Sequence, residues 1–153
     1  MPRELIVFFT AAVPIIELRG AIPLGFAMGL PAEATFLWAF LGNMFPCFFI
    51  LWLLDPVSKF LMKHSAFFNK NLTKLFENTR TKHKSSVEKW GAPFLITFVA
   101  IPLPGTGAWT GCLLSFLFGM KYWKGLICNA LGVVIADLLV TLSLAGILAI
   151  RFV

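Results

Sequence analysis

Two interrupted apolar stretches decide the fold of this chain: ELRGAIP at residues 17–23 and IPLPGTGAWTG at residues 101–111. Each lies in the middle of a longer apolar block. Proline there removes a backbone donor, and glycine adds backbone freedom. Each block is therefore predicted to form two half-helices joined by an irregular segment. Irregular backbone at membrane depth persists only where protein or a watery cavity surrounds it.

The composition around these stretches is typical of a membrane protein. Of 153 residues, 59% are hydrophobic and 13% are charged, and the mean hydropathy is +0.87. A soluble domain of this size has too little interior to bury so much apolar surface. The net charge of +6 does not indicate a nucleic-acid partner, because a basic stripe needs a soluble platform. We therefore expect an all-α integral membrane protein.

The apolar blocks are arranged two and two around a basic stretch. About 20 apolar residues cross a bilayer core of about 30 Å, so the second and fourth blocks are long enough to span. The sequence predicts two units, each a re-entrant hairpin followed by a spanning helix. The predicted ranges are a first unit at 1–55 (hairpin about 4–30, helix about 32–55), a linker at 56–90, and a second unit at 91–153 (hairpin about 91–119, helix about 122–151).

The two units also resemble each other in sequence. With Gly29 set on Gly119, the pair Leu41-Gly42 falls on Leu131-Gly132 at the same offset. With a short gap, the first break aligns with Thr106-Gly107-Ala108 of the second. The match predicts an internal repeat, although chance similarity between apolar helices is the alternative.

The distribution of lysine and arginine predicts the topology. Cytoplasmic loops collect these residues, so the linker at 56–90 should be cytoplasmic, with an amphipathic helix on the inner leaflet. Lys121 and Lys124 also stay inside if the third block enters from the cytoplasm and returns. The hairpins then enter from opposite faces as an inverted repeat, which places both termini outside. Four ordinary spanning helices, two of them kinked, would place both termini in the cytoplasm.

Glu17 and Arg19 are candidate functional residues because ionisable groups inside a bilayer are expensive. Arg19 would bind an anionic head group or substrate. Glu17 would couple transport to protons, because burial disfavours the charged form of a carboxylate. The alternative is a mutual ion pair that only neutralises both side chains.

The breaks add a second argument for a binding site. Half-helices that start near Gly20 and Thr106 would aim their N-terminal amides at the membrane centre, where they can hold anions. Thr106 is a candidate N-cap, and the alternative is turn chemistry alone. The predicted substrate-binding residues are Glu17, Arg19, Gly20, Pro102, Pro104, Gly105, Thr106 and Gly107.

Asp137 and the three cysteines are the other residues in the apolar blocks that could carry chemistry. Asp137 is either a second proton-coupling residue or a hydrogen-bonding partner of a facing helix. Cys47, Cys112 and Cys128 lie in apolar stretches and are interpreted as small hydrophobic residues. No Ser-His-Asp set, metal-ligand cluster or phosphate-binding loop is present in the sequence. We expect no enzymatic activity, no cofactor and no bound metal.

At both quoted stretches the chain resembles the small multidrug export protein family, which is distantly similar to the DedA/VTT superfamily. The resemblance implies opposed re-entrant hairpins, proton-dependent transport, and movement of polyprenyl phosphates or phospholipids between leaflets. In this resemblance, Glu17 matches the acidic residue in the first hairpin of the DedA proteins, and the match at Arg19 is loose. DedA proteins carry arginines near the proline of the second hairpin, whereas residues 103–110 here contain none.

These observations predict a small transporter that exports or translocates an amphiphile or a lipid phosphate between the two hairpins. Protons or another ion would drive it. It would lie in the cell membrane as a multi-pass protein in contact with membrane lipids. Two spanning helices are too few to enclose a pathway, so a homodimer or larger homo-oligomer is expected. The alternative is a non-transporting scaffold that binds lipid or partners through its linker helix, and a channel is a third option.

Overall fold

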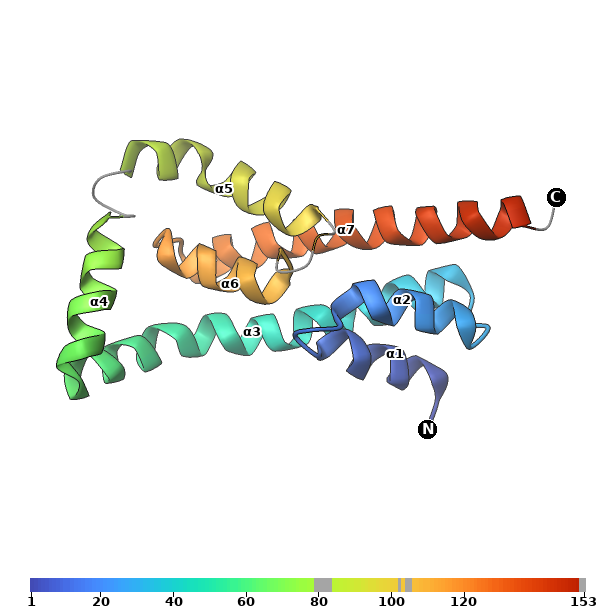
Figure 1. Cartoon of the computed structure of the whole chain (residues 1–153), viewed down its shortest axis with the longest axis horizontal. Coiled ribbons are helices and arrows are strands. Elements are labelled where there is room, and N and C mark those ends of the chain that lie inside the picture. The colour runs from blue at the N-terminus through green and yellow to red at the C-terminus, as the bar shows by residue number, and fades with distance from the viewer. Residues whose placement is uncertain (79–83, 102, 104–105, 152–153) are drawn as a thin grey trace.

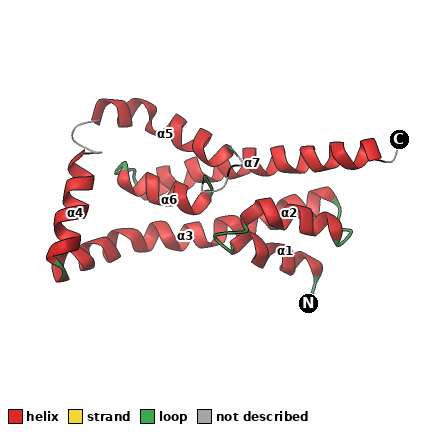
Figure 2. Cartoon of the chain, in the orientation of Figure 1, coloured by secondary structure: helices red, strands yellow, loops and turns green. Residues whose placement is uncertain are grey.

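The computed structural model describes residues 1–78, 84–101, 103 and 106–151, and the regular structure in these ranges is entirely helical (Figure 2). The predicted all-helical class is thereby confirmed. The helices are α1 (Arg3–Ala12), α2 (Glu17–Ala27), α3 (Ala32–His64), α4 (Ala66–Phe76), α5 (Lys84–Ala100), α6 (Ala108–Leu117) and α7 (Tyr122–Arg151).

Two long helices form the centre of the molecule, and two helical hairpins pack on them. α3 and α7 lie in contact and run in opposite directions (Figure 1). The first hairpin (α1 and α2) covers one half of their length, and the second hairpin (α5 and α6) covers the other half. The end of α5 and the connection between α1 and α2 both lie near the middle of the molecule. α4 turns away from the end of α3, toward the side on which α5 begins.

The two central helices are long and apolar enough to cross a membrane. Their most apolar windows have mean hydropathies of 1.9 in α3 and 2.2 in α7. Their outward faces expose large apolar side chains, which in water would form an unusually large patch. Examples are Phe45, Phe49, Trp52, Leu131, Leu138 and Leu142.

The inward faces of the same helices carry small and polar side chains. Residues spaced four apart line one face of a helix. On α7 this buried face includes Asn129, Val133, Asp137 and Thr141, and on α3 it includes Asn43. Apolar residues thus face outward and polar ones inward, as expected when lipid is the solvent.

Both hairpins end in the same cap. Gly29 and Gly119 have positive φ angles of 75° and 67°, which favour glycine. The following amide, of Leu30 or Met120, donates to a carbonyl five residues earlier at 3.0 Å in both cases. This is the Schellman pattern, so the alignment of Gly29 with Gly119 corresponds to a shared backbone turn.

Two helix ends differ from the expected ranges. α3 continues through Pro56 to His64 instead of ending near residue 55, and α5 begins at Lys84 instead of near residue 91. Pro56 removes one backbone hydrogen bond, but the helix continues through it, and the apolar residues after it still follow a helical period. The helix ends at Ser65, whose φ of −141° is extended, and the amphipathic α4 follows.

Candidate functional site

The candidate site is the junction at which the first hairpin contacts the break of the second hairpin. Glu17 and Arg19 reach it from the start of α2. They meet the residues between α5 and α6, of which 101, 103, 106 and 107 are described. Pro102, Pro104 and Gly105, which the sequence also predicts for the site, lie outside the described residues.

Glu17 acts as a cap for a helix of the other hairpin. Its side chain is buried, and its two carboxylate oxygens lie directly against Gly107, the N-cap residue of α6. The backbone N–H of Trp109, the second residue of α6, lies close enough to interact favourably with the carboxylate. Free amides and the helix dipole make a helix N-terminus favourable for an anion. The N-terminus of α6 is therefore already occupied by a carboxyl group that the chain itself supplies.

The backbone at Glu17 is strained. Its φ of 50° lies in the left-handed region, which a non-glycine residue rarely adopts. Such a conformation costs about 1–3 kcal/mol and persists only where the surroundings enforce it. The contact of the Glu17 side chain with α6 is an interaction that can hold the backbone in this conformation. Strain of this kind concentrates at sites where a segment switches between two arrangements.

Arg19 binds the other side of the same break. Its Nη1 donates to the carbonyl oxygen of Leu103, and its Nη2 donates to the carbonyl of Ile101 at 3.4 Å and to Thr106 Oγ1 at 3.1 Å. Carbonyls at a helix C-terminus have no partners within the helix and attract cations. Arg19 thus adds a charged donor to carbonyl oxygens that also accept hydrogen bonds from within the break.

Glu17 and Arg19 do not form a direct ion pair. Among the described residues the single ion pair within 4.0 Å joins Lys59 and Asp55, far from this junction in sequence. Arg19 still attracts the Glu17 carboxylate electrostatically. The alternative in which the two side chains only neutralise each other is therefore not what the structure shows, because each one contacts the second hairpin.

Two local predictions are corrected by the structure. α2 begins at Glu17, so Gly20 lies within its first turn and not at its start. The N-cap of α6 is Gly107 and not Thr106. The Thr106 hydroxyl instead donates to the Ile101 carbonyl at 2.6 Å and accepts from Arg19. It bridges the break because it lies one residue too early to reach the amides of α6.

Trp109 is the contributor that the sequence reasoning missed. Its amide binds Glu17, while its indole Nε1 is buried without a hydrogen-bond partner. Arg19 Nε is likewise buried and unpartnered. The sequence signal was available, because a residue two positions after an N-cap glycine presents a free amide.

Asp137 lies apart from the junction contacts. It is fully buried on α7, and neither carboxylate oxygen has a hydrogen-bond partner. Thr141, one turn along, is its near polar neighbour, but the hydroxyl is not placed for a hydrogen bond. No hydrogen bond or ion pair links Asp137 to Glu17 or Arg19 in the part of the chain that the structure describes.

Comparison with known proteins gives one result. Residues 17–139 match a family model described as "Putative small multi-drug export protein". This range begins at the junction carboxylate and ends just after Asp137. No curated protein and no solved structure matches the chain.

Proposed function

This chain belongs to the small multidrug export protein family, and we propose that it is a proton-coupled transporter which moves an amphiphile past the junction of its two hairpins. One observation carries the proposal. A buried carboxylate of the first hairpin, Glu17, closes the N-terminus of a helix in the second hairpin. Family membership and the two long apolar helices make the chain a membrane protein of an export family.

The proposed membrane arrangement follows from the positions of the hairpins. α3 and α7 span the bilayer, and the hairpins enter it from opposite faces as inverted units. This arrangement is supported by hairpins that cover opposite halves of the central helices and meet in the middle (Figure 1). The basic linker at 56–90 is proposed to lie in the cytoplasm, because cytoplasmic loops collect lysine and arginine. Because two spans enclose little space, the working unit is proposed to be a homodimer or larger.

Protonation of Glu17 is the proposed trigger for opening. A charged carboxylate is attracted to the N-terminus of α6, and a neutral carboxyl group loses most of that attraction. Without the cap, the strained backbone at Glu17 can relax and the hairpins can separate. An ionisable group at membrane depth that holds two movable elements together is typical of transport pathways. Asp137 is a candidate for a second proton site in the same cycle.

A lipid phosphate is the second candidate substrate. Two buried donors, Arg19 Nε at the junction and the indole Nε1 of Trp109 in the first turn of α6, have no hydrogen-bond partner. Once Glu17 leaves, these donors and the α6 amides would face the same space and suit a phosphate. In the closed arrangement, however, both Nη atoms of Arg19 are occupied by the second hairpin. A phosphate would therefore bind only after the junction opens.

Reconstitution into liposomes tests the proposal. A pH gradient should drive uptake of a fluorescent amphiphile and simultaneous proton movement. Glu17→Gln keeps the side-chain shape but cannot ionise, so it should abolish proton-driven flux while the protein still inserts and folds. Glu17→Asp, which keeps the charge, is the matched control and should retain partial flux. Unchanged proton-driven flux in Glu17→Gln would refute the mechanism.

A further inference from the structure

Two cavities lie along the second half of α3, the first against α6 and the start of α7 and the second against α4 and α6. The first has a volume of about 360 Å³ and the second about 200 Å³. Phe116 of α6 lines both, and adjacent turns of α3 form one wall of each. The first is lined by Leu51, Asp55, Phe116, Gly119, Met120 and Tyr122.

The lining of the first cavity favours a positive charge. Asp55 is the charged residue of its wall. Gly119 and Met120 follow the C-terminal end of α6, where the helix dipole is negative. The aromatic residues Phe116 and Tyr122 line the same space, and aromatic faces attract organic cations. The negative end of α6 is offset by the positive start of α7 at Tyr122, so the Asp55 carboxylate is the group that opposes an anionic head group.

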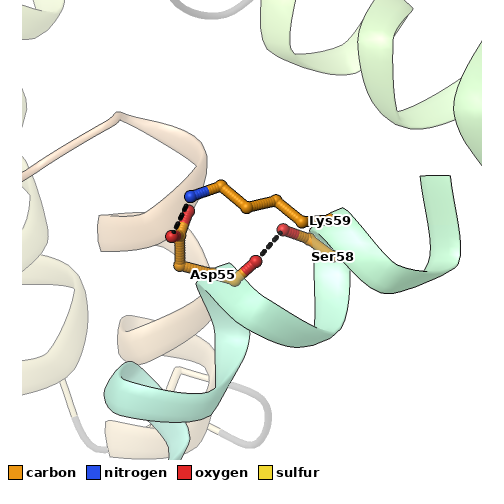
Figure 3. Close-up of polar contacts among 3 residues, drawn as sticks. All are labelled: Asp55, Ser58 and Lys59. Carbon is orange, nitrogen blue, oxygen red and sulfur yellow. Dashed lines mark hydrogen bonds and ion pairs between the residues drawn. The ribbon is translucent and has the colours of Figure 1, made fainter. Parts of the chain in front are cut away.

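The carboxylate of Asp55 already holds a cation. Lys59 Nζ lies 2.6 Å from its Oδ2, and the two side chains are 72% and 61% exposed (Figure 3). An exposed ion pair of this kind contributes little to stability. Lys59 can therefore be displaced at little cost, and its ammonium group stands where a ligand ammonium group would bind.

The wall of the second cavity is apolar. Its wall is formed by leucine, valine and phenylalanine side chains, and Ser58 is the polar residue among them. The Ser58 hydroxyl donates to the Asp55 carbonyl at 2.9 Å, so its hydrogen is directed away from the cavity and into the helix (Figure 3). Such a space suits an aliphatic chain and offers nothing to a polar group.

On the basis of the transport function proposed above, we propose that the two cavities together bind an amphiphile with an organic ammonium head group and an aliphatic tail. The head group replaces Lys59 on Asp55, and the tail lies between α3, α4 and α6. The site is at the end of the molecule that carries the basic linker (Figure 1). A substrate collected there would reach the junction from that side.

Binding of two probes with the same tail tests this site. Purified protein in an uncharged detergent should bind dodecyltrimethylammonium, measured by titration calorimetry, and should bind dodecyl phosphate at least tenfold more weakly. Asp55→Asn should weaken binding of the ammonium probe by roughly two- to fivefold, the modest loss expected when an exposed ionic contact is removed. Lys59→Gln should strengthen it, because the internal competitor is gone. Glu33→Gln, an exposed acid near the opposite end of α3, is the matched control and should change nothing.

Equal binding of the phosphate probe, or ammonium binding that is indifferent to Asp55, would overturn the assignment. So would unchanged or weaker binding in Lys59→Gln. The site and the transport function fail separately. If binding depends on Asp55 but no flux occurs in liposomes, the transport function is refuted and the binding site stands. If flux occurs and does not depend on Asp55, the transport function stands and the binding site is refuted.

Discussion

The carboxylate of Glu17 occupies the space that a side chain at position 107 would need. Gly107 has an extended backbone that any residue can adopt, with φ −83° and ψ −175°. A Cβ added there would nevertheless collide with both carboxylate oxygens. The glycine is thus required by its contact with another hairpin and not by its own conformation. The two breaks are built to fit one another.

Gly107→Ala should open the junction. The added methyl group forces Glu17 off the N-terminus of α6, and overpacking of this kind costs about 1–3 kcal/mol. We expect a lower unfolding temperature in detergent and a loss of coupling between proton and substrate flux. Gly146→Ala is the matched control, because nothing lies within 4 Å of a Cβ at that position.

A double mutant tests whether the effect of Gly107→Ala comes from its collision with Glu17. If the collision with Glu17 is responsible, Gly107→Ala should do little further harm in a Glu17→Ala background, because the colliding group is absent. Residues in contact show such non-additivity, whereas independent sites add. Fully additive losses of stability would contradict the contact.

Asp137→Asn should stabilise the protein and impair transport. The carboxylate is fully buried without a hydrogen-bond partner, and a buried unpaired charge opposes folding. Removing it should raise the unfolding temperature by about 2–4 °C, the shift that corresponds to about 1 kcal/mol in a domain of this size. Proton-driven flux should fall, because an asparagine side chain cannot take up and release a proton as a carboxyl group does.

The control for Asp137 is an acid exposed to solvent. Glu33→Gln should change neither the unfolding temperature nor the flux. A substitution at Asp137 that destabilises the protein and leaves transport intact would instead show a packing role for this residue.

The position of the N-terminus distinguishes re-entrant hairpins from four spanning helices. In a chain whose three cysteines are replaced by alanine, a cysteine at Arg3 should react with a membrane-impermeant maleimide added to intact cells. A cysteine at Asn71, exposed on α4, should react only after the membrane is permeabilised. Protection of both positions in intact cells is the result that four spanning helices predict.

The sequence by itself determined the helical class, the family and the two breaks. These rest on local chemistry: apolar runs long enough to span, proline and glycine that interrupt them, and buried charges at Glu17 and Asp137. It also located the matching turns at Gly29 and Gly119, because a positive φ favours glycine wherever it occurs.

Only the tertiary structure decided what these charges touch. Nothing near Glu17 in the sequence indicates that its carboxylate binds the amide of Trp109, or that Arg19 binds the carbonyls of Ile101 and Leu103. These partners lie more than eighty positions away along the chain, and they come together because α3 and α7 pack in opposite directions. Periodicity and propensity report on neighbours within a few turns of a helix, so contacts between the two hairpins could not be read from the sequence of either one.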